Sequence, residues 1–255
     1  DYLAGHAVPG ISGITRGPPA RPPSALRENT VNLILFMPDE MRAESLACYG
    51  HPVSRTPNYD RLAEQGVLFE QCHVQHTVCS PSRCSMMTGW YPHVAGHRTL
   101  WHLLRPHEPS LFATLRQAGY HVEWYGKNDL YAPATFAQAV NRFANPPGGH
   151  SGANAHAYGD PAYYAFDFSP FGGRLEDTGD MRCVQAGIEF LRSRRPSDPP
   201  FVLYLPLTMP HPPYAAPEPY HSMFDPDGLA PLRPSDPGGK PGYVAGIREH
   251  RGLER

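Results

Sequence analysis

Short, nearly continuous apolar runs are the feature that most constrains the fold of this chain. Val31 to Met37 reads V-N-L-I-L-F-M, and Phe201 to Leu207 reads F-V-L-Y-L-P-L. Runs of this length and continuity are typical of strands that are buried on both faces of a parallel sheet. We therefore expect two such strands here, and further strands at 67–74 and 120–125.

Helix signals lie between the predicted strands. A capping residue followed by a helix-compatible segment occurs at Thr56-Pro57, Ser80-Pro81, Ser110 and Asp180. Glycines at 66, 89 and 119 end the first three segments, and the fourth is expected to continue to about residue 194. Alternating strand and helix signals predict an α/β fold with a mostly parallel central sheet flanked by helices.

Composition limits the domain organisation and the possible partners. The chain has 255 residues, a formal charge of −2 and 31 prolines, which gather at the two ends and after residue 195. We expect a flexible arm at 1–30, one incomplete domain at 31–225 and a linker-like tail at 226–255. Acidic and basic residues are scattered, so no nucleic-acid partner is expected.

Cysteine usage and hydropathy argue against a disulfide-rich protein and against a membrane-spanning one. The five cysteines form no C-x-x-C pair, so a disulfide framework is a poor interpretation. No apolar run is long enough to span a membrane, and the first 29 residues lack the apolar segment of a signal peptide. This leans towards a cytoplasmic location, although the chain begins with Asp rather than Met, so its true start can be missing.

Polar residues follow three of the predicted strands at the points where those strands end. Asp39-Glu40, Lys127 and His211 each lie just beyond an apolar run. In open α/β sheets, ligands bind at the carboxyl ends of the strands. We therefore expect these residues to converge on one site.

The segment Cys79-Ser80-Pro81-Ser82-Arg83 carries the most specific chemistry. Cys79 is expected immediately before a short helix that Ser80 caps. The positive end of that helix, together with Arg83 on its first turn, would attract an anion held beside the sulfur. A buried structural cysteine is the alternative that these residues alone leave open.

Four ordered motifs resemble a known family. T-V-C-S-P-S-R-C-S-M-M-T-G at 77–89 resembles the C-x-P-x-R signature of type I sulfatases, and Gly119-Tyr120 with Gly126-Lys127 resembles their second signature. The acidic pair at 39–40 and P-H-P-P at 210–213 follow the family's order. The resemblance covers about residues 31–225 and implies an alkaline-phosphatase-like fold whose C-terminal part is missing.

The resemblance also implies a reaction. A sulfatase hydrolyses a sulfate monoester, here of a small molecule or sugar, to an alcohol and sulfate. Its signature cysteine is oxidised by a maturation enzyme to formylglycine, whose hydrate attacks sulfur with one hydroxyl and expels sulfate through the other. A divalent cation, usually calcium (Ca2+), draws charge off the sulfate oxygens. No membrane partner is implied.

Residue roles carry over position by position. Asp39, Glu40 and the modified Cys79 are expected to hold the metal. Arg83 is expected to hold the nucleophile and metal ligands in place, and Lys127 to bind the sulfate. His211 would contact the ester and help to protonate the leaving alcohol.

The sequence departs from the family pattern in three ways. Glu40 stands where the family usually has Asp, and Asp129 stands where G-K-x-H has its histidine. Asp129 could act as a base, yet it would repel a sulfate. The remaining metal ligands of the family would follow residue 255. Calcium is coordinated by about six to eight oxygens, which Asp39, Glu40 and residue 79 do not supply alone. We therefore expect this chain by itself to be inactive or very weak.

Three other interpretations remain open. A phosphonate monoester or phosphodiester hydrolase of the same superfamily would use the same motifs. A non-catalytic sulfate-binding protein would keep Cys79 unmodified. A zinc-binding module could use the ligand types gathered within thirteen residues, although their spacing lacks a C-x-x-C knuckle; these are Cys72, His73, His76, Cys79 and Cys84.

Overall fold

The computed structural model describes residues 30–149, 153–160, 162–163, 168–229, 239, 241–250 and 252. The arm expected at 1–30 therefore lies almost wholly outside the described residues. The chain divides into two compact units. The first contains residues 1–41, 67–148 and 179–209, and the second contains 42–66, 149–178 and 210–255.

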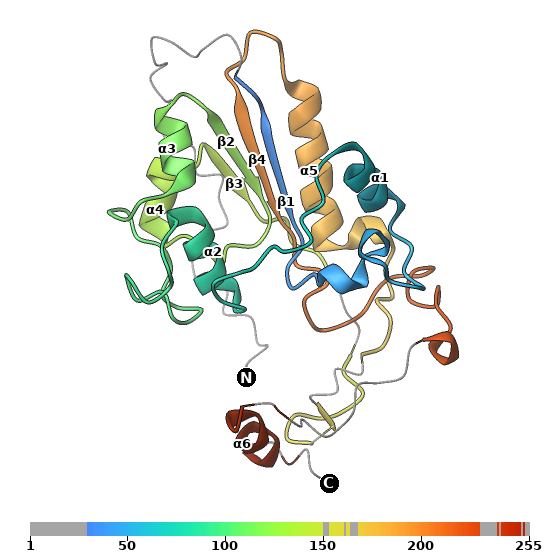
Figure 1. Ribbon diagram of the computed structural model, residues 1–255. Helices are drawn as coiled ribbons and strands as arrows, with labels where there is room; N and C mark the ends of the chain where they lie inside the picture. The colour runs from blue at the N-terminus through green and yellow to red at the C-terminus, as the bar shows by residue number, and fades with distance from the viewer. Residues whose placement is uncertain are drawn as a thin grey trace. The chain divides into compact units, whose positions relative to one another are not determined.

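A four-stranded sheet forms the centre of the first unit (Figure 1). Its strands are β1 (Leu33–Met37), β2 (His121–Tyr125), β3 (Arg142–Ala144) and β4 (Phe201–Pro206), in the order β1-β4-β2-β3. Every neighbouring pair is parallel. The prediction of a parallel α/β sheet is thus confirmed, and all carboxyl ends of the strands lie at one edge.

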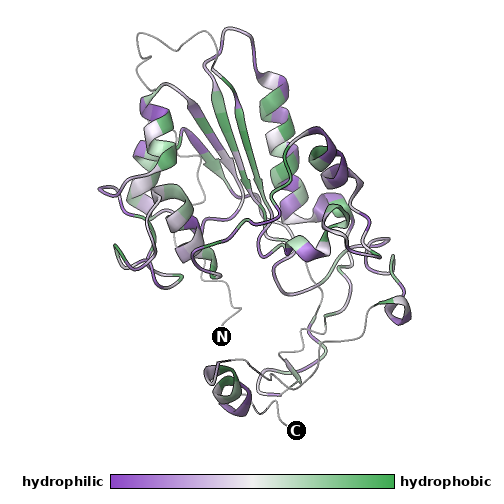
Figure 2. Cartoon of the chain, in the orientation of Figure 1, coloured by the Kyte–Doolittle hydropathy of each residue, from purple (hydrophilic) through white to green (hydrophobic). Residues whose placement is uncertain are grey.

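Helices cover both faces of this sheet (Figure 1). One face carries α2 (Cys79–Thr88), α3 (Leu111–Gln117) and α4 (Pro133–Ala139), and the other carries α5 (Gly179–Ser193). The green strands in Figure 2 mark the apolar layer between them. Trp124 and Tyr204 are fully buried on the first face, where they pack at 4.8 Å between ring centroids.

β4 and β1 differ in burial. All six residues of β4 are buried, as expected of a central strand. β1 is not buried on both faces as predicted, since Ile34 and Phe36 are 55% and 47% exposed. The reason is its place at the edge, where it pairs only with β4 among the described residues.

The strand expected at 67–74 is also wrong. This segment is irregular and has a turn at Glu70–Gln71, while Val67, Phe69 and Val74 are exposed. A strand needs a neighbour to satisfy its backbone groups, and in the described part of the chain this segment has none. An apolar run indicates that a segment can form a β-strand. Whether the strand forms depends on a neighbouring strand with which its backbone can pair.

The sequence predicts the helix starts to within two residues, but not all of the caps. Ser110 caps α3 as expected, since its side chain accepts a hydrogen bond from Ala113 N. α2 begins at Cys79 rather than after it, with Val78 as the N-cap, so Ser80 does not cap it. Asp180 lies inside α5, and its carboxylate accepts the backbone N–H groups of Thr208 and Met209 beyond β4.

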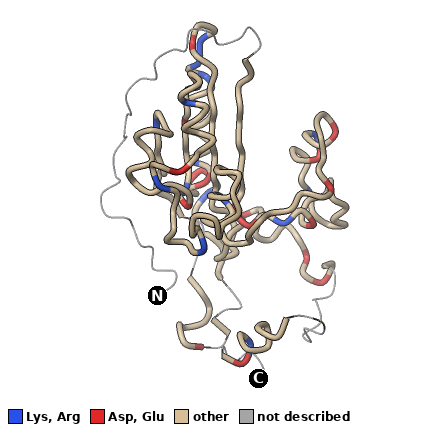
Figure 3. Tube along the Cα trace, turned by 60° about the vertical axis from the view of Figure 1, so that its left-hand side comes forward, with Lys and Arg blue, Asp and Glu red and all other residues tan. Residues whose placement is uncertain are grey.

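The second unit contains α1 (Pro57–Gln65), α6 (Tyr243–His250) and short 3-10 turns at Ala43–Ser45, Ala47–Tyr49, Leu175–Asp177 and Pro226–Gly228. Thr56 precedes α1 as predicted; its hydroxyl accepts from Ala47 N and donates to Asp60. Across the described residues, acidic and basic positions are interspersed along the trace (Figure 3). Within the same residues, no helix has both the length and the apolar character that a membrane crossing requires.

The aromatic core should dominate the stability of the first unit. Phe112 is 1% exposed and contacts the rings of Trp124, Tyr131 and Tyr204, whereas its neighbour Leu111 is 46% exposed. We expect Phe112→Ala to lower the free energy of unfolding by about 3–5 kcal/mol, because it removes buried area and leaves a cavity. Leu111→Ala, the matched control in the same helix, should cost less than about 1 kcal/mol. Urea unfolding measures both, and equal losses would contradict this packing.

Candidate active site

Asp39 is the centre of the polar cluster at the carboxyl edge of the sheet. It lies two residues beyond β1, and it is only 6% exposed. Arg83 Nη2 donates to its Oδ1 at 2.9 Å, and Lys127 Nζ donates to its Oδ2 at 2.5 Å. A buried carboxylate needs such compensation, because burial removes the water that would otherwise solvate its charge.

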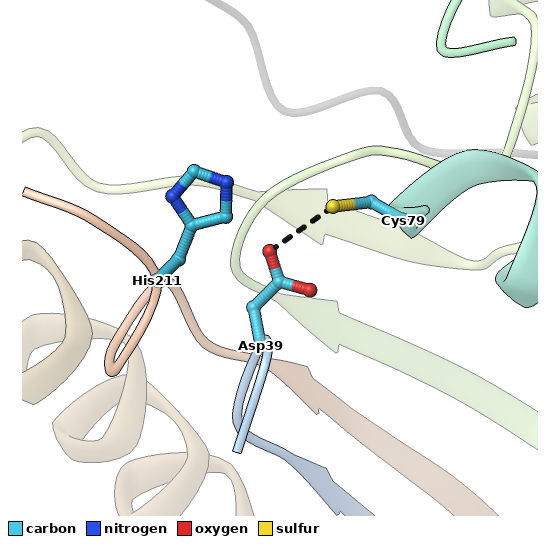
Figure 4. Close-up of side chains that lie close together, drawn as sticks. All are labelled: Asp39, Cys79 and His211. Carbon is cyan, nitrogen blue, oxygen red and sulfur yellow. Dashed lines mark hydrogen bonds between the residues drawn. The ribbon is translucent and has the colours of Figure 1, made fainter. Parts of the chain in front are cut away.

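α2 brings two signature residues to this carboxylate. Cys79 and Arg83 are four positions apart and therefore share a face of the helix. The Cys79 thiol is directed at Asp39 Oδ2, 3.4 Å away (Figure 4). Arg83 is 3% exposed and also donates to the Tyr204 hydroxyl at 3.0 Å. Residue 79 thus lies at the positive end of α2, beside a fixed guanidinium.

Gly126 explains how Lys127 reaches the same place. It follows β2 directly and has a φ of 137°, a conformation that L side chains rarely adopt. A Cβ at this position would lie 2.2 Å from the backbone oxygen of Pro206 at the end of β4. Glycine therefore lets β2 and β4 remain close as they end, and Lys127 N donates to that same oxygen at 3.0 Å.

Asp129 supplies a second carboxylate to Lys127. Its Oδ2 lies 2.8 Å from Lys127 Nζ and 3.9 Å from Arg83 Nε. This oxygen is buried and, within the described part of the chain, has no aligned hydrogen-bond donor. The cluster consequently contains two acidic and two basic side chains, those of Asp39, Asp129, Arg83 and Lys127.

The charges shift the protonation of the cluster in definite directions. Burial alone would raise the pKa of Asp39, but Lys127 and Arg83 outweigh it and hold that pKa below its usual value. Burial opposes the charge of Lys127, yet Asp129 and Asp39 outweigh it and raise the pKa of the ammonium. Burial, aided by Asp39, raises the pKa of the Cys79 thiol to about 11. An unmodified Cys79 is therefore a protonated, weak nucleophile near neutral pH.

The two other residues expected at the site are Glu40 and His211. Glu40 is exposed and has a φ of 58°, an uncommon conformation for a residue with a side chain, which is found disproportionately at functional sites. His211 belongs to the second unit, where its Nδ1 lies 2.6 Å from the Pro212 carbonyl oxygen. The roles of Glu40 and His211 remain predictions.

Sequence reasoning missed two contacts that support the site. Tyr204 lies in a predicted apolar strand, yet its hydroxyl accepts a hydrogen bond from Arg83. Ser80 was expected to cap α2 but instead donates to the Leu100 carbonyl, which anchors the following loop against the start of α2. A single hydroxyl in a buried strand was the signal available for Tyr204.

The zinc grouping does not form in the described part of the chain. Cys84 is fully buried in the core, whereas Cys72 is exposed. None of the residues Cys72, His73, His76 and Cys84 belongs to a group of three or more possible metal ligands there. The clustering of these residue types in the sequence therefore does not translate into a common site.

Comparisons with known proteins identify similar sequences. The family model described as Sulfatase matches residues 31–230. An N-acetylglucosamine-6-O-sulfatase of Bacteroides thetaiotaomicron is 28% identical over 175 residues, which are 68% of this chain and 29% of that protein.

Two solved structures show the same fold. A phosphonate monoester hydrolase of Agrobacterium radiobacter has a TM-score of 0.63 at 21% identity and is matched over 81% of this chain and 46% of its own. A protein solved with its substrate D-glucosamine-2-N,6-O-disulfate has a TM-score of 0.55 at 22% identity, over 72% of this chain and 35% of its own. The chain thus spans about a third to a half of the length of these proteins.

Acid should weaken the Asp39 network. Its folded-state pKa lies below the unfolded value of 3.8, so its contribution is complete above that value and is lost as the pH falls through the folded pKa. We expect Asp39→Asn to be less stable than the parent above about pH 5, and this difference to shrink below about pH 4 as Asp39 is protonated. Urea unfolding across pH, with a chelator present, measures it. A difference that does not change with pH would contradict the network.

Alkylation should report the environment of Cys79. In the cysteine form of the chain, its reaction with iodoacetamide should be slow at about pH 8 and accelerate towards the pKa of about 11, since the thiolate is the nucleophile. Asp39→Asn should lower the midpoint of this profile, because it removes a negative charge beside the sulfur. Peptide mass spectrometry resolves Cys79 from Cys72, which is exposed and serves as the internal reference. A midpoint that stays fixed in the variant would refute the coupling.

Proposed function

The chain belongs to the sulfatase family, and on that premise we propose that it provides the nucleophile half of a sulfuric ester hydrolase. The reaction is the hydrolysis of a sulfate monoester to an alcohol and sulfate. The observation that supports it most is the convergence of Cys79, Arg83 and Lys127 on the Asp39 carboxylate. Together with Asp39, these residues come from three of the four motifs.

Two groups would complete the chemistry. Formylglycine at position 79, made by a maturation enzyme, supplies an oxygen nucleophile in place of the thiol. A divalent cation, with calcium as the proposed ion, lowers the pKa of that nucleophile and offsets charge on the ester oxygens. Asp39, Glu40 and residue 79 offer oxygen donors that suit calcium, although they fill only part of its shell of about six to eight.

The remaining residues are proposed to position the reacting groups or to bind the ester. Arg83 is buried and holds Asp39 and Tyr204, so it fixes the carboxylate that faces residue 79. Lys127 donates one hydrogen bond to Asp39 and forms an ion pair with Asp129, and its ammonium is proposed to bind an ester oxygen as well. His211 is proposed to protonate the leaving alcohol.

The substrate is proposed to be a sulfated sugar or another sulfated small molecule. The relative from Bacteroides thetaiotaomicron is named for a sulfated amino sugar, and one protein of the same fold was solved with a disulfated glucosamine. Because the chain spans 29% of the first of these proteins, the activity proposed here is that of a protein that also supplies the rest of the fold.

A second candidate is hydrolysis of a phosphonate monoester or phosphodiester. Such esters carry one negative charge on a tetrahedral centre, as sulfate monoesters do. Asp129 supports this candidate, because it replaces the histidine of the sulfatase motif. Relative kcat/KM for an aryl sulfate and an aryl phosphonate separates the two candidates.

Replacement of Cys79 tests the proposal. In the full-length gene product made with a maturation enzyme, we expect peptide mass spectrometry to find an aldehyde in place of the thiol at position 79. Cys79→Ala should lower kcat/KM on an aryl sulfate by roughly a thousandfold or more, because the nucleophile is lost. Cys72→Ala, at an exposed cysteine away from the cluster, is the matched control. Full activity of Cys79→Ala would refute the proposal.

A further inference from the structure

Asp129 adds a negative charge where an ester anion is proposed to bind. Its Oδ2 faces the two cations of the cluster, at 2.8 Å from Lys127 Nζ and 3.9 Å from Arg83 Nε. The oxygen is buried, and none of the described residues gives it an aligned hydrogen bond. Coulomb attraction to the two cations is therefore its main compensation.

The cluster is balanced before any ligand arrives. Asp39 already offsets Arg83 through a direct hydrogen bond and an ion pair. Asp129 then offsets Lys127, which is the more exposed of the two cations. An anion that binds to Lys127 thus meets an ammonium that already pairs with two carboxylates, those of Asp39 and Asp129.

The cost of this arrangement depends on the charge of the ligand. At neutral pH a sulfate monoester carries one negative charge, and so does a phosphonate monoester or a phosphodiester. A phosphate monoester carries nearly two, because its second pKa is about 6. Each additional negative charge within a few ångströms of Asp129 is repelled, and partial burial weakens the screening of that repulsion.

We propose that Asp129 is a specificity-determining residue that favours singly charged tetrahedral esters over doubly charged ones. The inference rests on the proposed function, since it requires that the ester binds at Lys127. It narrows the substrate class to sulfate monoesters, phosphonate monoesters and phosphodiesters. Phosphate monoesters are selected against by charge rather than by shape.

Binding tests this selectivity without requiring turnover. The chain is titrated calorimetrically at fixed ionic strength with methyl sulfate, which carries one charge, and with inorganic sulfate, which carries two. Asp129→Asn should increase the affinity for sulfate relative to methyl sulfate by roughly tenfold or more, since one repulsion is removed. Asp129→Glu should retain the parent ratio.

Asp198→Asn is the matched control for the loss of one negative charge. Asp198 precedes β4, at the opposite end of the strands from the cluster, and its carboxylate accepts from Arg195 N at 2.8 Å. Asparagine can keep that hydrogen bond. The affinity ratio of this variant should equal that of the parent.

Turnover in the full-length gene product provides the second measurement. The ratio of kcat/KM for an aryl sulfate to that for an aryl phosphate should fall by roughly tenfold or more in Asp129→Asn. A purely structural role would lower both rates together and leave this ratio unchanged, which would overturn the inference. Failure to bind either anion would overturn it as well.

The two proposals fail differently. A protein that hydrolyses aryl sulfates, but whose selectivity does not respond to Asp129→Asn, keeps the proposed function and loses this inference. A protein that prefers methyl sulfate through Asp129, but hydrolyses no ester, keeps the charge selectivity of anion binding and loses the proposed function.

Discussion

The buried Asp39 carboxylate is the constraint from which the polar site follows. A charge in this position is tolerated only with close partners, and both of its oxygens have them. Arg83 comes from α2 and Lys127 from the end of β2, so one carboxylate joins a helix to two strands of the sheet. Truncation of Arg83 or Lys127 would leave the buried Asp39 carboxylate with only one of its two cationic partners, which couples the integrity of the site to that of the fold.

Backbone geometry at the strand ends makes this convergence possible. Gly126 permits β2 to pass within contact distance of Pro206, and Lys127 starts from that point. Asp180 meanwhile binds the backbone beyond β4 with both carboxylate oxygens. The segments that follow the neighbouring strands β2 and β4 are thus fixed by hydrogen bonds.

The sequence predicted the parts of the fold that depend on local signals. Parallel strands β2 and β4, the cap at Ser110 and the convergence of Asp39, Cys79, Arg83 and Lys127 followed from periodicity and motifs. The predictions of a strand at 67–74 and of a fully buried β1 were wrong. Strand pairing depends on neighbours that are distant in the sequence, and a local pattern does not specify them. The Tyr204 contact was missed for a related reason, since a hydroxyl among apolar residues does not identify its partner.

The open edge of β1 affects how the chain is expected to behave in solution. Among the described residues its outer edge has no neighbouring strand, and Ile34 and Phe36 are exposed beside it. Unpaired backbone groups flanked by apolar side chains invite pairing with the same edge of another molecule. Concentrated solutions of this chain are therefore expected to self-associate through β1, and a charged residue at position 34 would be the direct way to keep it monodisperse.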